Sequence, residues 1–359
     1  MKVPYALLVV AATTVGVALA SELSHREERM FFASNPVVCE GNAGRTGACL
    51  PYFRCDSYGG KVEGSCSVVG QCCVVHKSCG ETSPARTTYF NHNQLDIADG
   101  DTCSVTLTTS NKIAAQDICQ LHVTLKRKRA EREGGGKLEG GRAEDSIKIC
   151  GNGNNQMLVV DVAGLEGPFK VSVVSVEDNP DSEWEVKVVQ VPCDKGDLAP
   201  SGCDQYVIGL TGEVKSFNYD TKASSRNHDN DKPGSRHLQE SYTICVRPEE
   251  GYCGLKWTAP SEEEDKYAFT LTDNLAPDGS EAVFGVKVNE QCDFTDYLVV
   301  TEAHIEEDED TTTILCGSRF PTAVFSNSFK IRVEANEKEL EDEEIDNRGF
   351  HLKYEQQKC

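Results

Sequence analysis

Short segments in which apolar and polar residues alternate recur along most of the chain after residue 79. Examples in the first half are CSVTLTT, CQLHVTL, QMLVVDVA, FKVSVVSV and WEVKVVQV. A period of two residues is typical of a half-buried strand, and valine, isoleucine, threonine and tyrosine favour strands. No stretch shows a long helical period. The pattern predicts an all-β chain built from antiparallel sandwiches.

The second half repeats this plan in CDQYVIGLTGEVKSFNY, YTICV, YCGLKW, YAFTLT, CDFTDYLVV, FKIRVEA and GFHLKYEQ. Internal similarity links QDICQLHVTL (116–125) to EGYCGLKWTA (250–259). It also links EVKVVQVPC (185–193) to GFHLKYEQQKC (349–359). Two homologous units are therefore expected, one over residues 79–193 and one over residues 203–359.

The first twenty residues, MKVPYALLVVAATTVGVALA, combine a charged Lys2, an apolar run and a small-residue site at Ala18-Leu19-Ala20. This order predicts a secretory signal peptide over residues 1–20. The alternative, a membrane anchor, is disfavoured because the run is short and no second long apolar run follows. We expect a secreted, extracellular protein without a membrane anchor, with a flexible arm over residues 21–38.

Cysteine is abundant, with 17 residues in all and none in the predicted signal. A secreted chain of this kind is normally built on disulfides, and an odd count leaves at least one thiol without an intramolecular partner. Six cysteines lie within residues 39–73, where crosslinks would supply most of the stability of so short a segment. Because Cys72 and Cys73 are adjacent, each needs a different partner.

Six cysteines with short gaps and a terminal Cys-Cys make residues 39–73 similar to a clip domain. This small arthropod module is found in front of serine proteases and in some secreted non-enzymes. The gap between Cys55 and Cys66 is short for that family. The resemblance implies three pairs, namely Cys39–Cys72, Cys49–Cys66 and Cys55–Cys73. The alternative is a generic disulfide knot with another connectivity.

The second unit resembles a CUB domain, an extracellular jelly-roll sandwich. The marks that carry the resemblance are Cys203, Gly209, Gly212, Ser216-Phe217-Asn218-Tyr219, Cys245, CDFTDYL from Cys292, Cys316-Gly317, Pro321 and the closing GFHLKY from Gly349. The CDFTDYL segment is one residue longer than the family pattern. The resemblance implies the pairs Cys203–Cys245 and Cys292–Cys316, which leaves Cys253 to pair with Cys359.

The first unit looks like a diverged CUB domain. By position, Cys79 would pair with Cys103 and Cys119 with Cys193. Cys150-Gly151 matches the Cys-Gly mark, but its partner is missing, and KRKRAEREGGGKLEGGRAED occupies that region as a charged, glycine-rich loop. Cys150 is therefore expected to be unpaired, either as a buried or capped thiol or in an intermolecular disulfide.

The whole order resembles a group of secreted arthropod CUB-domain proteins. The expected fold is all-β, with tandem jelly-roll sandwiches after a small disulfide-rich module.

The net charge limits the classes of partner that the chain can bind. The formal net charge is −22, and the region from Cys203 onward contains 33 acids and 16 bases. A nucleic-acid binder usually has the opposite balance, so that class is excluded. The acidic runs 261–265, 306–310 and 339–346 and the basic run 126–132 are expected in loops. They are either solvated or patches for an oppositely charged partner, and the acidic runs could also collect calcium weakly.

No enzyme motif is present. A serine protease needs a serine, a histidine and an acid in a defined arrangement, and neither Gly-Asp-Ser-Gly-Gly nor Ala-Ala-His-Cys occurs. His-Glu-x-x-His, the zinc protease motif, is also absent. We expect no catalytic residues and a protein that is not an enzyme.

Calcium is the one cofactor for which the sequence offers candidate ligands. Some CUB domains bind it through the aspartate of the Cys-x-Tyr-Asp motif and two further acids. Asp296 matches that aspartate, and Glu290 is the acid closest to a second ligand position. Because calcium takes six to eight oxygen ligands, further carboxylates would have to converge there. The alternative is that Asp296 caps a turn at the entry to a strand.

Three functions remain. The first is a secreted, non-enzymatic protein that binds an extracellular protein or glycan through its CUB domains. The second is a regulatory cofactor of an extracellular serine-protease cascade in innate immunity, which only the clip-like knot supports. The third is a hydrolase with an unrecognised site.

Overall fold

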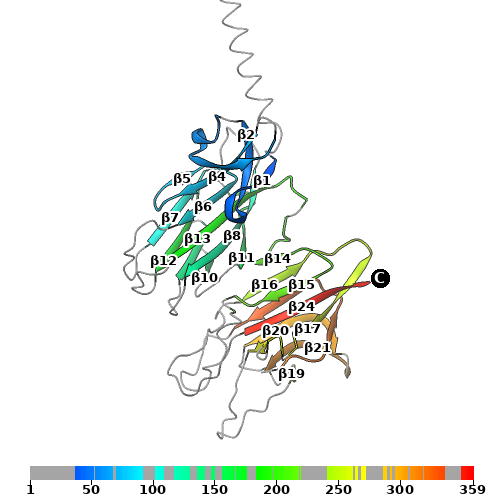
Figure 1. Cartoon of the computed structure of the whole chain (residues 1–359). Coiled ribbons are helices and arrows are strands. Elements are labelled where there is room, and N and C mark those ends of the chain that lie inside the picture. The colour runs from blue at the N-terminus through cyan, green and yellow to red at the C-terminus, as the bar shows by residue number, and fades with distance from the viewer. Residues whose placement is uncertain are drawn as a thin grey trace, which may run out of the picture. The chain divides into compact units, whose positions relative to one another are not determined.

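The computed structural model describes residues 37–51, 53–67, 70–91, 102–108, 117–129, 136–141, 147–149, 156–165, 167–175, 183–196, 198–217, 219, 241–261, 263–265, 268–271, 286–288, 292, 296–305, 308–317, 319–335 and 349–359. These residues form strands and two short 3-10 turns, without an α-helix among them (Figure 1). The described chain divides into two compact units, one that ends at Val75 and one that begins at His76. The fold is all-β, as predicted.

A disulfide-rich segment opens the described chain. Its elements are β1 (Val38–Glu40), η1 (Asn42–Gly44), β2 (Thr46–Pro51), η2 (Asp56–Tyr58), β3 (Gly60–Ser65) and β4 (Gly70–Lys77). β2 lies between β1 and β4, and β3 pairs with β4. Val38, which we expected at the end of the flexible arm, is the first residue of β1. The predicted signal peptide and residues 21–36 of the arm lie outside the described residues.

Strand geometry explains how the adjacent cysteines of β4 find different partners. Successive side chains on a strand point to opposite faces of the sheet. Cys72 is bonded to Cys39 and Cys73 to Cys55, while Cys49 is bonded to Cys66. These are the three pairs that the clip resemblance implies. Gly60 permits one of them, because a Cβ atom at this position would lie 2.5 Å from the Cys73 sulfur.

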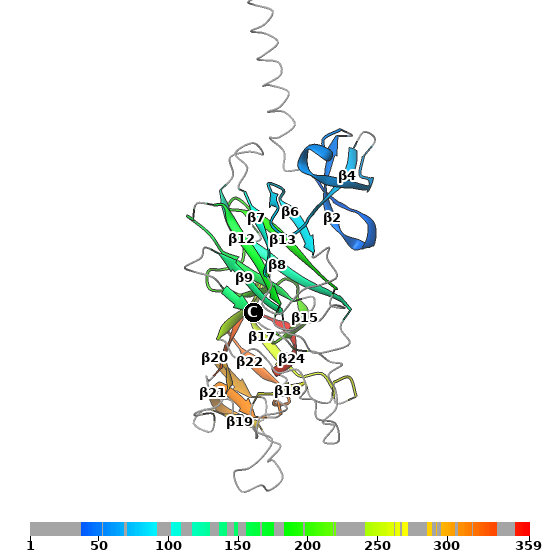
Figure 2. The same cartoon turned by 90° about the vertical axis from the view of Figure 1, so that its left-hand side faces the viewer.

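The next part of the chain is a sandwich of two sheets. One sheet contains β6 (Thr87–Asn91), β13 (Glu183–Pro192), β8 (Ile118–Arg129) and β11 (Met157–Asp161) in that order. The other runs in the order β10 (Ile147–Ile149), β9 (Gly136–Gly141), β12 (Phe169–Ser175), β7 (Thr102–Leu107) and β5 (Thr82–Ser83). Figure 2 shows β12 and β7 in one sheet and β13 and β8 in the other. Alternate residues fill the core between them, among them Phe90, Val105, Leu107, Leu121, Val123, Val171, Val186 and Val188.

Part of the charged, glycine-rich segment of this sandwich forms strands where we expected a loop. Residues 126–129 belong to β8 and pair with β13, and residues 136–141 form β9, which pairs with β12. Both were expected in a loop. Their charge and glycine content give these two segments a low intrinsic strand propensity, so the sequence did not indicate strands. Cross-strand pairing to the neighbouring strands outweighs that low propensity.

The last part of the chain is the second sandwich. Its strands follow the order β14 (Gln205–Val207), β16 (Tyr242–Val246), β23 (Lys330–Glu334), β20 (Tyr297–Ile305), β22 (Val324–Ser326), β17 (Tyr252–Thr258), β24 (Gly349–Lys358) and β15 (Thr211–Lys215). β18 (Phe269–Thr270) pairs with β24, and β21 (Asp308–Gly317) pairs with β20 and with β19 (Val286–Val288). The core includes Ile244, Leu255, Trp257, Leu271, Leu298, Ile331, Val333, Phe350 and Leu352. Residues 308–310 of the acidic run 306–310 lie in β21, not in the expected loop.

Five disulfides cross-link the two sandwiches internally. They are Cys79–Cys103 and Cys119–Cys193 in the first, and Cys203–Cys245, Cys253–Cys359 and Cys292–Cys316 in the second. Each is a pair that we expected from the CUB resemblance. Cys150 lies outside the described residues. No helix in the described part of the chain has the length and apolar character needed to span a membrane.

Candidate functional site

The exposed face of the second sandwich carries an ordered array of polar side chains. On β24, Phe350, Leu352 and Tyr354 are buried in the core, so the intervening positions point to the opposite side of the sheet. Directly opposed residues of antiparallel strands share a face. The register therefore builds a first row of His304, Phe325, Lys256, Glu355 and Thr211, and a second row of Thr258, Lys353 and Glu213. We call these eight residues the outer face.

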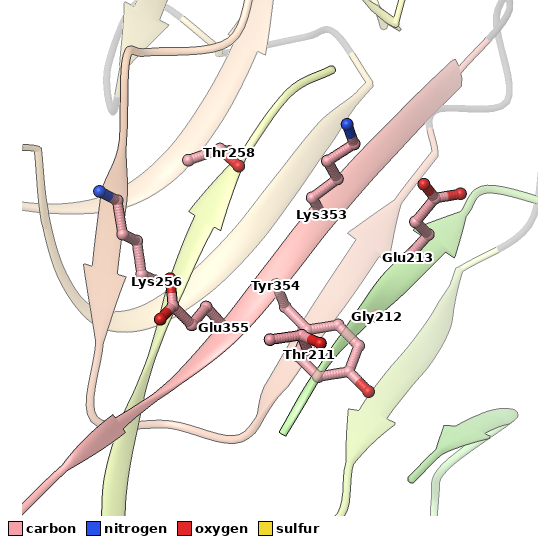
Figure 3. Close-up of a pocket in the computed structure, with 8 residues that line it drawn as sticks. All are labelled: Thr211, Gly212, Glu213, Lys256, Thr258, Lys353, Tyr354 and Glu355. Carbon is pink, nitrogen blue, oxygen red and sulfur yellow. The ribbon is translucent and has the colours of Figure 1, made fainter. Parts of the chain in front are cut away.

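A shallow hollow of about 430 Å³ lies on β15, β17 and β24 (Figure 3). Its lining residues are Thr211, Gly212, Glu213, Lys256, Thr258, Lys353, Tyr354 and Glu355. Sites for small molecules are usually enclosed and mainly apolar. An open hollow lined by two glutamates, two lysines and two threonines instead suits the polar surface of a larger partner.

One end of the first row is aromatic. The rings of His304 and Phe325 stack with their centroids 5.2 Å apart and an angle of 13° between their planes. The Lys256 ammonium lies 5.5 Å from the centroid of the Phe325 ring. A cation at this distance is attracted by the ring quadrupole. This contact places the Lys256 ammonium at the aromatic end of the first row.

Charges in the two rows differ in how they are engaged. Lys353 donates two hydrogen bonds to Glu264, with nitrogen–oxygen distances of 2.9 and 2.8 Å. These bonds, with one from the Ser261 amide, lower the pKa of Glu264 to about 2. Among the described residues, no ion pair involves Lys256 or Glu355. These two opposed charges are the ones that remain available to a partner.

Behind the second row, four side chains form a continuous hydrogen-bonded network. The His351 ring lies with Nδ1 3.2 Å from Asp265 Oδ2 and Nε2 3.0 Å from Glu213 Oε2. The Tyr219 hydroxyl donates to the same oxygen of Asp265. The network joins β24, β15, the turn before β18 and the segment after β15.

Sequence analysis missed this network. Asp265 was expected in an acidic loop, either solvated or serving as a patch for a basic partner, yet its side chain is buried. Ser261 and Glu264 form a reciprocal pair in which each backbone amide donates to the other side chain. The Ser-x-x-Glu pattern within SEEED is the signal that would have indicated an ordered turn. Tyr219 and His351 lie within the two quoted CUB marks, but no sequence pattern connects them.

The predicted calcium ligands are only partly described. Asp296 is buried, and its negative charge is close enough to contribute to the raised pKa of Tyr242, whose main cause is burial. Glu290 lies outside the described residues. A third ligand was expected near residues 334–337; of these, Glu334 is described and is paired with Arg332, while 336 and 337 lie outside the described residues. The described residues contain no group of three or more histidine, cysteine, aspartate or glutamate side chains placed to hold a metal ion.

The family model of the animal CUB domain matches residues 200–357. No curated protein matches the chain. The solved structures that resemble it include the CUB1-EGF-CUB2 domains of rat MASP-1, with 12% identity, 79% of this chain and 99% of that chain covered, and a TM-score of 0.23.

The PBSX exported protein XepA is a second such structure, with 11% identity, 90% and 98% coverage and a TM-score of 0.22. With TM-scores this low, the function of neither protein is evidence for the function of this chain. The family match covers the quoted marks of the second unit, from Cys203 to GFHLKY. The chain therefore carries an animal CUB domain over residues 200–357.

Proposed function

We propose that this chain is a secreted, non-enzymatic interaction protein that binds an extracellular protein or glycan through the outer face of its CUB domain. CUB domains generally mediate interactions between extracellular proteins. The observation that carries the proposal is the in-register pair Lys256 and Glu355 in an open polar hollow. Opposed charges of this kind, outside any ion pair among the described residues, select partners of complementary pattern.

Domain organisation supports a binding protein with several modules. In the first sandwich, β8 pairs with β13 and Cys119 is bonded to Cys193. In the CUB domain, β17 pairs with β24 and Cys253 is bonded to Cys359. We infer that residues 79–193 are a diverged CUB unit and that residues 39–73 are a clip-like knot. The proposed order is a signal peptide over residues 1–20, an arm over 21–38, the knot, the diverged unit and the CUB domain over 203–359.

The knot favours one alternative function, a regulatory role in an extracellular serine-protease cascade. Its three disulfides match the connectivity that the clip resemblance implies. Phe53, in the turn after β2, is 79% exposed and offers a partner an apolar contact point. Under this alternative, the partner is a protease zymogen and binding depends on Phe53.

The test is affinity capture from an extracellular fluid with the full chain, followed by affinity measurements with the captured partner. We expect Lys256→Glu and Glu355→Lys each to weaken binding by about tenfold, the loss typical of an interface residue that contributes strongly. Lys330→Glu, an exposed charge on β23, is the matched control and should bind normally. Equal binding by all three variants would contradict the role of the outer face. A captured zymogen lost only with Phe53→Ser would favour the alternative.

A further inference from the structure

The His351 ring is placed between two carboxylates that differ in exposure. Asp265 faces Nδ1 and its side chain is 4% exposed, whereas Glu213 faces Nε2 and its side chain is 52% exposed. The ring itself is buried and also lies against Tyr219, with the ring centroids 5.8 Å apart. Both ring nitrogens therefore face a carboxylate oxygen. Water can reach the Glu213 carboxylate in the folded protein, but it cannot reach that of Asp265.

Proton counting then decides which contacts can coexist. A carboxylate accepts hydrogen bonds but does not donate them, and a neutral imidazole has one N–H. Both contacts of His351 are hydrogen bonds only when the ring carries two protons. When the ring loses one proton, one nitrogen presents its lone pair to a carboxylate, and that contact becomes repulsive.

Exposure determines which contact is lost. Losing the His351 contact would remove one donor from the buried Asp265 carboxylate, where water cannot replace it, and this costs more than releasing an exposed carboxylate into water. Glu213 can turn into solvent. The proton of the neutral ring is therefore expected on Nδ1, toward Asp265, and Glu213 is the group set free.

Other charges surround this ring. They are Lys353 on the same strand, Glu213 and Lys215 on β15, and Glu264 and Asp265 from the turn before β18, with the Tyr219 hydroxyl beside them. Lys353 is engaged by Glu264. Lys215 lies directly opposite His351 in the register.

We propose that Glu213, His351 and Asp265 form a proton-operated clasp that controls the charge of the outer face. In the acidic range the imidazolium holds both carboxylates and neutralises Glu213 at the rim of the hollow. When rising pH removes one of the two ring protons, the ring keeps the Nδ1 proton and releases Glu213. The stabilisation from the Glu213 contact is thus present at low pH and is lost as the pH rises.

For ligand binding, the clasp rests on the proposed function. A released Glu213 adds a free carboxylate beside Glu355 in the hollow. A captured partner that presents a basic group to the hollow should bind more tightly above the titration than below it. If the ring titrates as proposed but binding does not change, the proposed use of the hollow fails while the clasp stands.

The clasp is tested by nuclear magnetic resonance of the full chain, labelled with ¹⁵N in its histidine rings. The chain has eight histidines, and His351→Gln identifies the signal of His351. We expect both ring nitrogens to be protonated at pH 5 and the less common Nδ1–H tautomer at pH 8. In Glu213→Gln the midpoint should move to lower pH by about half a unit, because one carboxylate that favours the charged ring is gone.

Glu355→Gln is the matched control, since it removes a carboxylate from the same face two strand positions beyond Lys353. Its titration should follow that of the unmodified chain. An Nε2–H tautomer at pH 8, or a ring that stays neutral from pH 5 to pH 8, would overturn the clasp. Equal midpoints in the two glutamine variants would overturn it as well.

Discussion

Gly212 leaves the space that the Tyr354 side chain occupies beneath the hollow. This residue lies on β15 directly opposite Tyr354 of β24. A Cβ atom at Gly212 would lie 2.7 Å from the Tyr354 hydroxyl oxygen and from one of its ring carbons. The tyrosine ring is buried, with its centroid 6.0 Å from that of the Trp257 ring, so a shift would disturb the packed core. The floor of the hollow therefore depends on a glycine at this position.

Replacing Gly212 with alanine should destabilise the CUB domain by about 1–3 kcal/mol, the usual cost of forcing an extra carbon into a packed site. Urea unfolding followed by tryptophan fluorescence measures this change. Gly196→Ala is the control, because its Cβ would meet no atom within 4 Å, and it should change stability by less than about 0.5 kcal/mol. Equal stability of the two variants would show that Tyr354 can move.

The network of His351 shows the limit of inference from sequence at this scale. Asp265 and His351 are 86 residues apart, and nothing in the local pattern of either reveals the other. Asp265 follows three glutamates, so charge alone predicts a solvated position. Tertiary packing turns it inward, and only the fold brings it to Nδ1 of His351.

Sequence patterns predicted the positions of whole strands much better than the contacts of single residues. Alternation located the strand around Val186 and Val188, and apolar runs located β17 and β20, because burial of one face imposes the period of two. Segments 126–129 and 136–141 were missed because their strands are held by pairing partners and have a composition typical of loops. Local composition does not contain that information.

The disulfide between β17 and the end of β24 gives a prediction for the elements it joins. Cys253 and Cys359 are separated by 106 residues, and Cys292 and Cys316 by 24. Chain-entropy arguments make the longer loop more stabilising by about 1 kcal/mol, with each bond contributing about 2–5 kcal/mol. The double serine variant at 253 and 359 should therefore lose more stability than the one at 292 and 316.

Urea unfolding in a Trp184→Phe background measures this difference, because Trp257 is then the one tryptophan left and reports on the CUB domain. The matched pair of variants removes two cysteines each, so changes in composition cancel. A larger loss at 292 and 316 would mean that local strain or residual unfolded structure outweighs loop length.

For the molecule as a whole, the dominant property is its uneven negative charge. The region from Cys203 onward contains 33 acids and 16 bases, out of a net charge of −22 for the whole chain. Close like charges destabilise a compact state, and salt screens them over a Debye length of ~8 Å at physiological ionic strength. The CUB domain should therefore be more sensitive to ionic strength than the rest of the chain.

We expect the melting temperature of the CUB domain to rise as sodium chloride is increased from about 10 to 150 mM, because screening reduces this repulsion. Trp257 fluorescence in the Trp184→Phe background measures it. Calcium and magnesium chloride at matched ionic strength separate screening from binding, since a ligand of the native state adds stabilisation beyond screening. A further rise with calcium alone that disappears in Asp296→Asn would assign a calcium site to Asp296. A melting temperature that falls with added salt would contradict the repulsion argument, because attractive ion pairs such as Lys353 with Glu264 would then dominate.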